Sequence, residues 1–440
     1  MKKWISVVLI LGLCFSLASC AFEGDSEDLM KDVTSQDPGS SALSDVASQD
    51  PISSESSDVV LSDPLDFKDF SSVQRNFSVK LFQKTVEGTG AENVLISPLS
   101  VSLALSMATN GAEGKTQSQM LQTLCGGAEM ERWNQSLFDY VKSLTSSESA
   151  KIKIANSVWF RNEEVTVKPE FLQKASDYYG ASAYKSPFDA GTVKDINRWV
   201  KTNTDGMIEK IIDRIDRDVM LYLINALTFE SDWQNVYKKH QVSDGFFTTA
   251  DGTKQKAEMM HDTLYTYLET DGAVGFVKDY ADGEFRFVAL LPDEGTAVND
   301  FVATLTEKSL STMMENVIKT KVITKMPKFS YDYSVEMRNI LRSMGMSDAF
   351  DRSAADFSQM GTMENGENLF LGKVLHKTHI EVGEKGTRAA AITVIEVPRD
   401  TAMPPQEEPK TVILDRPFFF MIVDGNENIP LFMGIVNSME

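Results

Sequence analysis

Residues 387–397 carry the pattern of a strand with one buried face. Successive side chains of a strand point to opposite faces of a sheet. One face here is uncharged and grows from small to larger apolar residues: Thr387, Ala389, Ala391, Thr393, Ile395 and Val397. The other face holds both charges of the segment, Arg388 and Glu396. The pattern favours a place in a sheet that is covered on one side.

The residues that follow have the character of an exposed loop. Residues 399–405 are polar and end in Pro404 and Pro405, and proline cannot donate to the hydrogen-bond ladder of a central strand. A strand-patterned segment that leads straight into an exposed loop can occupy two positions, one inside a sheet and one outside it.

Length and charge limit the protein's class. The 440 residues are 42% hydrophobic, which is enough for a large core, and length alone suggests two or three domains. The formal net charge of -21 opposes binding to a phosphate backbone, so we expect no nucleic-acid partner. Cys125 is the single cysteine after the N-terminal region. It lies in a helical pattern, and we expect a small buried apolar residue rather than a nucleophile.

The first 19 residues are predicted to be a signal peptide. Lys2 and Lys3 precede an apolar run that is too short to span a bilayer comfortably. The run ends in Leu-Ala-Ser-Cys at residues 17–20, which resembles the lipobox of bacterial lipoproteins. An ordinary secretory signal that ends in cysteine is the alternative. The resemblance implies cleavage before Cys20, lipidation of its thiol and a stable anchor of two or three acyl chains. We therefore expect export across the cytoplasmic membrane and a lipid-anchored protein that is at the cell surface or extracellular.

Residues 20–66 are expected to form a tether. After Cys20 they are rich in Ser and Asp, and the tetrapeptide Ser-Gln-Asp-Pro occurs at residues 35–38 and again at 48–51. Such a segment cannot bury enough apolar surface to offset the entropy lost on ordering. We predict a disordered acidic tether between the lipid and a folded body at residues 67–440.

The body opens with helix and strand signals. Apolar residues recur at helical spacing from Phe70 to Leu81, and residues 94–96 have the character of a short buried strand. Ser97 suits a helix N-cap and Pro98 the first helical position. The helix is expected to end at Asn110-Gly111.

Residues 93–100 resemble the Asn-x-x-x-Ser-Pro block of the serpin family. Further serpin-like motifs follow in family order: Asn156–Phe160, Ile196–Val200, Thr204–Ile208, Leu223–Ala226, Leu291–Gly295, Met326–Phe329, Asp415–Phe418 and Pro430–Gly434. The resemblance covers residues 67–440. It implies one α+β domain of the serpin fold, with three β-sheets (A, B and C), eight to nine helices and an exposed reactive-centre loop at about residues 384–410.

The resemblance also implies a function. Inhibitory serpins are suicide substrates of serine proteases: the protease acylates itself on the loop, and the hinge before the cut inserts into the main sheet and traps it. The hinge positions are Glu384, Gly386, Thr387, Ala389, Ala390 and Ala391. Arg388 stands where the family usually has glutamate. It faces outward by alternation, so its charge stays solvated after insertion.

The bond that the protease cuts stays open between two positions. The family's usual spacing from Glu384 places it at Asp400-Thr401, whereas alignment from Met403-Pro404-Pro405 places it at Arg399-Asp400. Arginine before the bond favours a trypsin-like protease, because its pocket pairs with a cation. An elastase-like cut after Val397, Thr401, Ala402 or Met403 is a third possibility, and subtilisin-like enzymes are also candidate partners.

Supporting residues follow from the same resemblance. Ser97, Ser100, Asn225 and His376 match the family's shutter, a buried polar cluster under the main sheet, and Trp233 matches the breach, where insertion begins. Buried polar groups need partners, so the cluster must be broken when the sheet opens.

The sequence contains few features that are typical of an enzyme. The four histidines, His240, His261, His376 and His379, form no zinc-binding pattern, and no Gly-x-Ser-x-Gly elbow is present. We expect a monomer with no enzymatic activity, no metal and no cofactor. The rival interpretation is a non-inhibitory serpin that acts as a surface binding or carrier protein. The uncharged inward face of the hinge favours inhibition.

Overall fold

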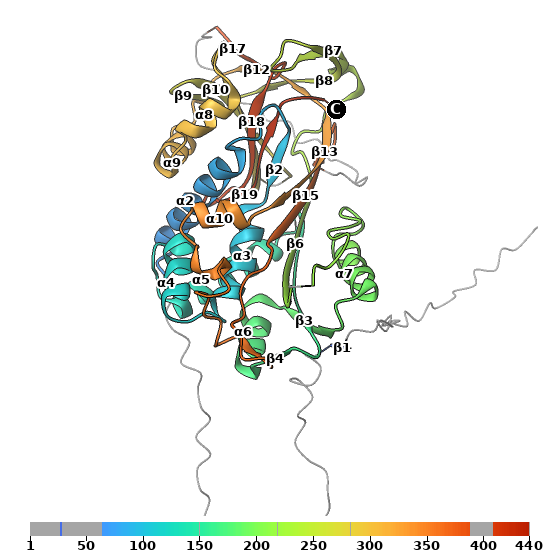
Figure 1. Cartoon of the computed structure of the whole chain (residues 1–440). Coiled ribbons are helices and arrows are strands. Elements are labelled where there is room, and N and C mark those ends of the chain that lie inside the picture. Colours follow the sequence, from blue (N-terminus) through green and yellow to red (C-terminus); the bar gives the residue numbers. More distant parts are fainter. Residues whose placement is uncertain are drawn as a thin grey trace, which may run out of the picture.

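A computed structural model of the whole chain describes residues 27–28, 64–148, 150–217, 219–281, 283–387 and 408–439 (Figure 1). Cys20, the predicted signal peptide and most of the predicted tether lie outside these ranges, as do residues 388–407 of the predicted loop. No helix in the described ranges is long and apolar enough to cross a membrane.

The described residues form nine α-helices. They are α2 (Phe67–Val86), α3 (Pro98–Thr109), α4 (Gly114–Cys125), α5 (Met130–Thr145), α6 (Pro169–Tyr179), α7 (Ala190–Asn203), α8 (Val298–Thr304), α9 (Glu307–Glu315) and α10 (Arg338–Ser343). Two short 3₁₀ turns, η1 (Lys239–Gln241) and η2 (Asp348–Phe350), accompany them. Helix α3 begins as expected, because the Ser97 side chain accepts from the Ser100 backbone N–H and Pro98 occupies the first helical position.

The largest sheet, sheet A, has seven strands. Their order is β1 (Glu27–Asp28), β5 (Ser182–Ser186), β3 (Lys151–Arg161), β6 (Leu221–Asp232), β16 (Gly386–Thr387), β15 (Leu375–Val382) and β13 (Phe329–Glu336). Strand β16 is the start of the segment whose alternation predicted a strand, and it lies between two much longer strands.

Two further large sheets and one small one complete the fold. Sheet B has the order β2 (Val94–Ile96), β19 (Pro430–Val436), β18 (Phe418–Asp424), β11 (Phe285–Pro292), β10 (Ala273–Asp279) and β9 (Tyr267–Thr270). Sheet C has the order β17 (Lys410–Ile413), β12 (Val322–Pro327), β8 (Lys254–Leu264) and β7 (Val242–Thr248). Strands β14 (Gly361–Met363) and β4 (Val165–Val167) form a two-stranded sheet, which the sequence did not predict.

Sheet A separates two hydrophobic clusters. Along β3, Val158 and Phe160 belong to the main core, whereas Trp159 between them belongs to a smaller cluster. Trp199 of α7 belongs to that smaller cluster, so α7 covers one face of the sheet while the bulk of the helices lies on the other (Figure 1). Both faces of the central strands are therefore buried, and a new strand would enter between two packed layers.

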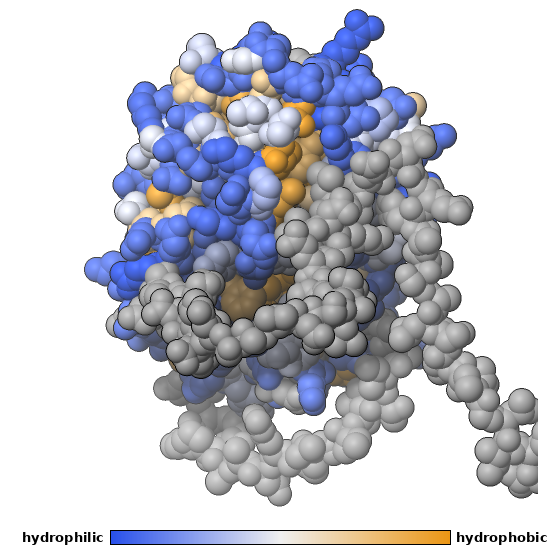
Figure 2. Space-filling model, turned by 90° about the horizontal axis from the view of Figure 1, so that it is seen from below, coloured by the Kyte–Doolittle hydropathy of each residue, from blue (hydrophilic) through white to orange (hydrophobic). Residues whose placement is uncertain are grey.

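Strands β18 and β19 form the centre of the main core. Every residue of both strands is buried, which matches their nearly unbroken apolar sequence. The molecule seen from below is mainly hydrophilic where it is coloured, with apolar residues reaching the surface between polar ones (Figure 2). The α+β class and the serpin-like architecture predicted from the sequence are confirmed.

Candidate functional site

Strand β16 fills one end of the space between β6 and β15. Gly386 pairs with Asp232 and Thr387 with Ser231 on β6, while Thr387 also pairs with Val382 on β15. Because β16 is antiparallel to both neighbours, β6 and β15 run parallel to each other. In the described residues, β6 and β15 are joined within the sheet only through β16. A chain that continued from Thr387 would run between them.

Gly386 is required by the close approach of β16 to β6. A Cβ atom added at Gly386 would lie 2.0 Å from the Ser231 carbonyl oxygen and 2.7 Å from the Asp232 Cα. Backbone atoms of a central strand cannot move aside at low cost, so glycine is the residue that permits this pairing.

Thr387 is held inside the sheet by a tyrosine. Its side chain is 3% exposed, and its hydroxyl shares a 2.5 Å hydrogen bond with the Tyr280 hydroxyl. The Tyr280 ring stacks on Trp233 with ring centroids 4.4 Å apart. Burial raises the pKa of Tyr280 well above its usual range, so this hydroxyl stays protonated as a hydrogen-bonding group.

Trp233 anchors the turn that leads into β16. Its indole N–H donates to the Gly383 carbonyl oxygen (2.8 Å). Its backbone N–H donates to the Lys385 carbonyl oxygen (2.6 Å). The backbone N–H of Tyr237 donates to the Glu384 carbonyl oxygen (2.9 Å). The tryptophan predicted at the breach therefore binds the hinge directly.

An ion pair fixes the outer side of the same turn. Lys328 Nζ lies 2.7 Å from Glu384 Oε1 and 3.0 Å from Glu258 Oε2. The hydrogen bond from Lys328 lowers the pKa of Glu384 below its usual value. Glu384, predicted as the first hinge residue, is thus tied to the residue just before β13.

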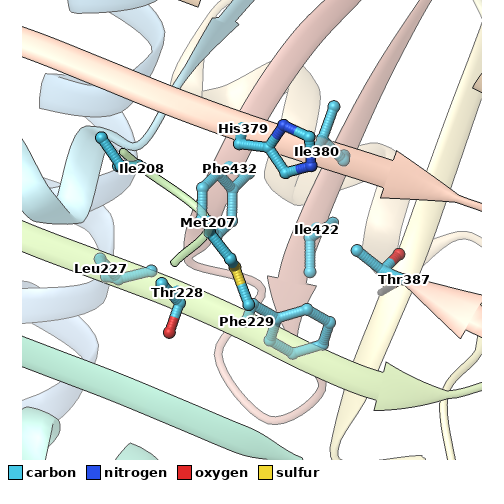
Figure 3. A pocket seen from close by; sticks show the side chains of 10 residues that line it. All are labelled: Met207, Ile208, Leu227, Thr228, Phe229, His379, Ile380, Thr387, Ile422 and Phe432. Carbon is cyan, nitrogen blue, oxygen red and sulfur yellow. The ribbon is translucent and has the colours of Figure 1, made fainter. Parts of the chain in front are cut away.

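A pocket lies beside β16 in the space between β6 and β15 (Figure 3). Its lining comes from β6, β15, β16, the chain after α7 and two strands of sheet B: Met207, Ile208, Leu227, Thr228, Phe229, His379, Ile380, Thr387, Ile422 and Phe432. Apolar side chains dominate the lining. Such a pocket suits small uncharged side chains, which is the character of the inward face predicted from Thr387 onward.

Three of the four predicted shutter residues form one hydrogen-bonded group. The Ser97 backbone N–H donates to His376 Nε2 (3.0 Å), and the Ser100 backbone N–H donates to Ser97 Oγ (3.3 Å). His376 is 6% exposed, and burial lowers its pKa to about 4. A neutral His376 can accept the Ser97 hydrogen bond, whereas a protonated one cannot.

Asn225 lies apart from that hydrogen-bonded group. Its side-chain NH₂ donates to Asn156 Oδ1 (2.7 Å), and Asn156 donates to the Tyr179 carbonyl oxygen (2.8 Å). Asn225 Oδ1 is buried and has no hydrogen-bond partner among the residues that the structure describes. The Asn225 side chain thus lacks one of its hydrogen bonds. It lies on β6, one of the two strands that border the space into which β16 leads.

The family model "Serpin (serine protease inhibitor)" matches residues 72–439. The chain belongs to the serpin family. Human Serpin B8 is 31% identical over 382 residues, covering 84% of this chain and 99% of the relative. An uncharacterized serpin-like protein of Thermococcus kodakarensis is 31% identical over 350 residues, covering 78% of this chain and 80% of the relative. The solved native state of the thermophilic serpin tengpin has a TM-score of 0.80 at 39% identity and covers 94% of this chain and 100% of its own.

Several predicted site residues of this serpin lie outside the described residues. They are the hinge positions Ala389, Ala390 and Ala391, the reactive-bond candidates Arg399, Asp400 and Thr401, and the lipidation candidate Cys20. In the described ranges, no group of three or more His, Cys, Asp or Glu side chains could hold a metal ion.

Sequence reasoning missed three residues that contact the predicted site of this serpin. Tyr280 binds Thr387, Lys328 binds Glu384, and Asn156 binds Asn225. Lys328 and Asn156 lie inside motifs that carried the resemblance, so their polar side chains in strand-like segments were available signals. Tyr280 lies in no such motif, and only the fold brings it to the hinge.

Proposed function

We propose that this serpin is a suicide-substrate inhibitor of serine proteases. The observation that carries the proposal is the position of β16, whose two residues occupy one end of the space between β6 and β15. The strand that the sequence pattern predicts would continue from Thr387 into that space. The uncharged inward face of the hinge favours inhibition over a binding or carrier function.

The proposed reaction begins as ordinary proteolysis. The protease serine oxygen attacks the carbonyl carbon of the scissile bond, an ester forms, and the peptide nitrogen leaves with a proton as the new amino terminus. Residues after Thr387 then enter between β6 and β15, antiparallel to both. The ester-linked protease is carried with them and distorted before water can cleave the ester.

The side chains of the described hinge support insertion. Thr387 is buried and lines the pocket, so alternation places Ala389 and Ala391 on the same inward side. Arg388 falls on the opposite side by the same rule. The inward side chains are small and uncharged, so they can enter quickly.

We further propose a trypsin-like target that cuts after Arg399, with cleavage after Asp400 as the second candidate. Elastase-like and subtilisin-like enzymes are the other target classes. We also propose that Cys20 carries lipid, so that the inhibitor acts at the cell surface, as a monomer held by the segment of residues 20–66.

The test is a covalent trap. The protein is incubated with trypsin, pancreatic elastase, chymotrypsin and subtilisin, followed by denaturing gels and mass spectrometry. A complex that survives denaturation, with one cleavage site at residues 397–403, supports inhibition. Cleavage of the loop without any covalent complex contradicts it and favours the carrier function.

A further inference from the structure

We propose that one end of sheet C is a second docking surface, which binds the protease body while the loop occupies the protease active site. This surface, called the sheet C patch, consists of Tyr265, Ile318 and Ile323 with Lys319, Lys321 and Lys410. The inference rests on the proposed function and adds to it a contact outside the loop.

The apolar part of the patch stands out from the rest of the described surface. Four large hydrophobic side chains are strongly exposed on the described surface, and all but Phe246 belong to the patch: Phe246 at 58%, Tyr265 at 53%, Ile318 at 42% and Ile323 at 39%. All four lie on sheet C or on the chain that leaves and enters it. Single exposed apolar residues are normal on any protein, but several together mark an interaction site.

Three of these four come from two neighbouring stretches of chain. Ile318 exchanges two backbone hydrogen bonds with Tyr267 (2.9 and 3.0 Å), and Ile323 lies opposite Thr263 on β8. Tyr265 lies between Thr263 and Tyr267 in sequence. Opposite residues of a ladder share one face, and so do residues two apart. Tyr265 lies in the bend that directly follows β8 and is exposed close to Thr263 along the chain.

Lysines surround these apolar side chains. Lys319 and Lys321 lie between Ile318 and Ile323, and the backbone N–H of Lys410 donates to the Lys321 carbonyl oxygen (2.9 Å). In the part of the chain that the structure describes, neither Lys319 nor Lys321 takes part in an ion pair. Glu315 and Glu408 are the nearest carboxylates in sequence, and Glu269 and Asp293 lie close enough to act on Tyr267, the residue paired with Ile318.

The charge of the patch indicates its occupant. The whole chain has a net charge of -21, so three lysines beside apolar side chains make this area less acidic than the molecule as a whole. A complementary partner surface has an apolar centre rimmed by carboxylates. Such a partner is repelled by most of this molecule and attracted here.

The position of the patch makes the captured protease that partner. Strand β17 begins at Lys410 and pairs with β12, placing Thr411 opposite Ile323; both strands lie at the same end of the molecule (Figure 1). About ten residues separate the candidate bond at Asp400 from Lys410, a reach of at most about 35 Å. A protease domain is about that wide, so an enzyme on the loop can touch the patch.

The docking contact predicts a rate effect rather than a change in chemistry. It raises the probability that an encounter leads to acylation, and its electrostatic part weakens with salt. It does not alter the fate of the acyl-enzyme, which the hinge decides. The rate of trapping and the yield of trapped complex therefore report on different parts of the molecule.

The experiment uses the full chain and whichever of the four named proteases the unaltered protein traps fastest. Two double variants are compared with it, Ile318→Ser with Ile323→Ser and Lys319→Glu with Lys321→Glu. Phe246→Ser is the matched control, because Phe246 is as exposed but lies opposite Lys256 on β8, out of phase with Thr263. We expect both double variants to slow trapping by about tenfold, equal to about 1.4 kcal/mol, with an unchanged covalent yield.

The remaining outcomes are also decisive. The salt dependence between about 50 and 500 mM should be weaker in the lysine variant than in the unaltered protein, and Phe246→Ser should trap within about twofold of the normal rate. Trapping by both double variants at the normal rate overturns the docking surface and leaves the proposed function intact. Absence of any covalent complex with the unaltered protein overturns the proposed function and this inference with it.

Discussion

At the scale of single residues, the hinge depends on hydroxyl and backbone groups that have lost contact with water. Thr387 is buried between two strands, and the Tyr280 hydroxyl is its hydrogen-bond partner. A buried hydroxyl without a partner costs about 1–3 kcal/mol, so this pair favours a hinge in which Thr387 stays in the sheet.

Replacing Thr387 with arginine tests the inward face. The new guanidinium would place a charge where the pocket is lined by Leu227 and Ile380, and burying an unpaired charge is strongly unfavourable. Insertion should become slower than hydrolysis of the acyl-enzyme. We expect Thr387→Arg to be cleaved as a substrate, with the covalent yield on denaturing gels falling by about tenfold or more.

Lys385→Ala is the matched control, because Lys385 is exposed and two residues away. It should trap protease normally. A Thr387→Arg protein that traps protease as well as the unaltered one would show that side-chain size and charge at this position do not limit insertion.

His376 makes the stability of the folded protein depend on pH. Burial lowers its pKa from 6.5 to about 4, so the folded state favours the neutral ring. Its contribution to stability is complete above about pH 6.5 and is lost as pH falls toward 4, with a maximum loss of about 3 kcal/mol. We expect unfolding of the uncleaved protein to accelerate over that interval, as followed by intrinsic fluorescence.

His376→Gln separates this group from the other titrating side chains. Glutamine keeps an acceptor for the Ser97 backbone N–H but does not titrate. Its unfolding rate should therefore change less between about pH 6.5 and pH 4. If the unfolding rates of His376→Gln and of the unaltered protein depend on pH equally, other titrating groups cause the faster unfolding at low pH.

At the scale of elements, β16 is a strand of two residues that depends on one glycine. A Cβ at position 386 would meet the Ser231 carbonyl at 2.0 Å, so Gly386→Ala should expel β16 from sheet A. We expect amide hydrogen exchange at Thr387 to accelerate by about tenfold or more. Gly383→Ala is the control, because a Cβ there meets nothing within 4 Å. Unchanged exchange in Gly386→Ala would contradict the pairing of β16 with β6.

The elements differ in how far the sequence determined them. Ser97 and Pro98 predicted the start of α3, and alternation predicted an inward-facing Thr387, because both signals are local. Asn225 was predicted in the shutter with His376, yet its hydrogen bond goes to Asn156 on β3. The Tyr280–Thr387 pair joins residues more than a hundred positions apart. No local pattern encodes such contacts, since they depend on how distant strands are brought together.

At the scale of the whole molecule, the proposed lipid anchor would determine where the proposed inhibition takes place. Cys20→Ala removes the thiol that the lipobox resemblance assigns to lipid. We expect the unaltered protein to partition into the detergent phase and to label with a radioactive fatty acid, whereas Cys20→Ala should do neither. Cys125→Ala is the matched control, because its thiol is buried in the body. Fatty-acid labelling that survives in Cys20→Ala would contradict the anchor.

Cleavage of the loop tests the central property of the whole molecule, the incomplete filling of sheet A. In the described residues, β6 and β15 meet within the sheet only through the two residues of β16. Insertion of about ten more residues would form about twenty new hydrogen bonds, because a central strand pairs on both sides; at about 0.5 kcal/mol net each, they would stabilise the protein by roughly 10 kcal/mol. The melting temperature should then rise by roughly 10–15 °C.

The measurement is calorimetry before and after a single cut within residues 388–407, with protein exposed to inactivated protease as the control. Thr387→Arg, cut in the same place, should gain less, because its charge opposes entry of the first inward position. A cleaved protein that melts at or below the temperature of the uncleaved one would mean that the strand stays outside the sheet. The position of β16 would then be a fixed feature of the fold rather than the first step of insertion.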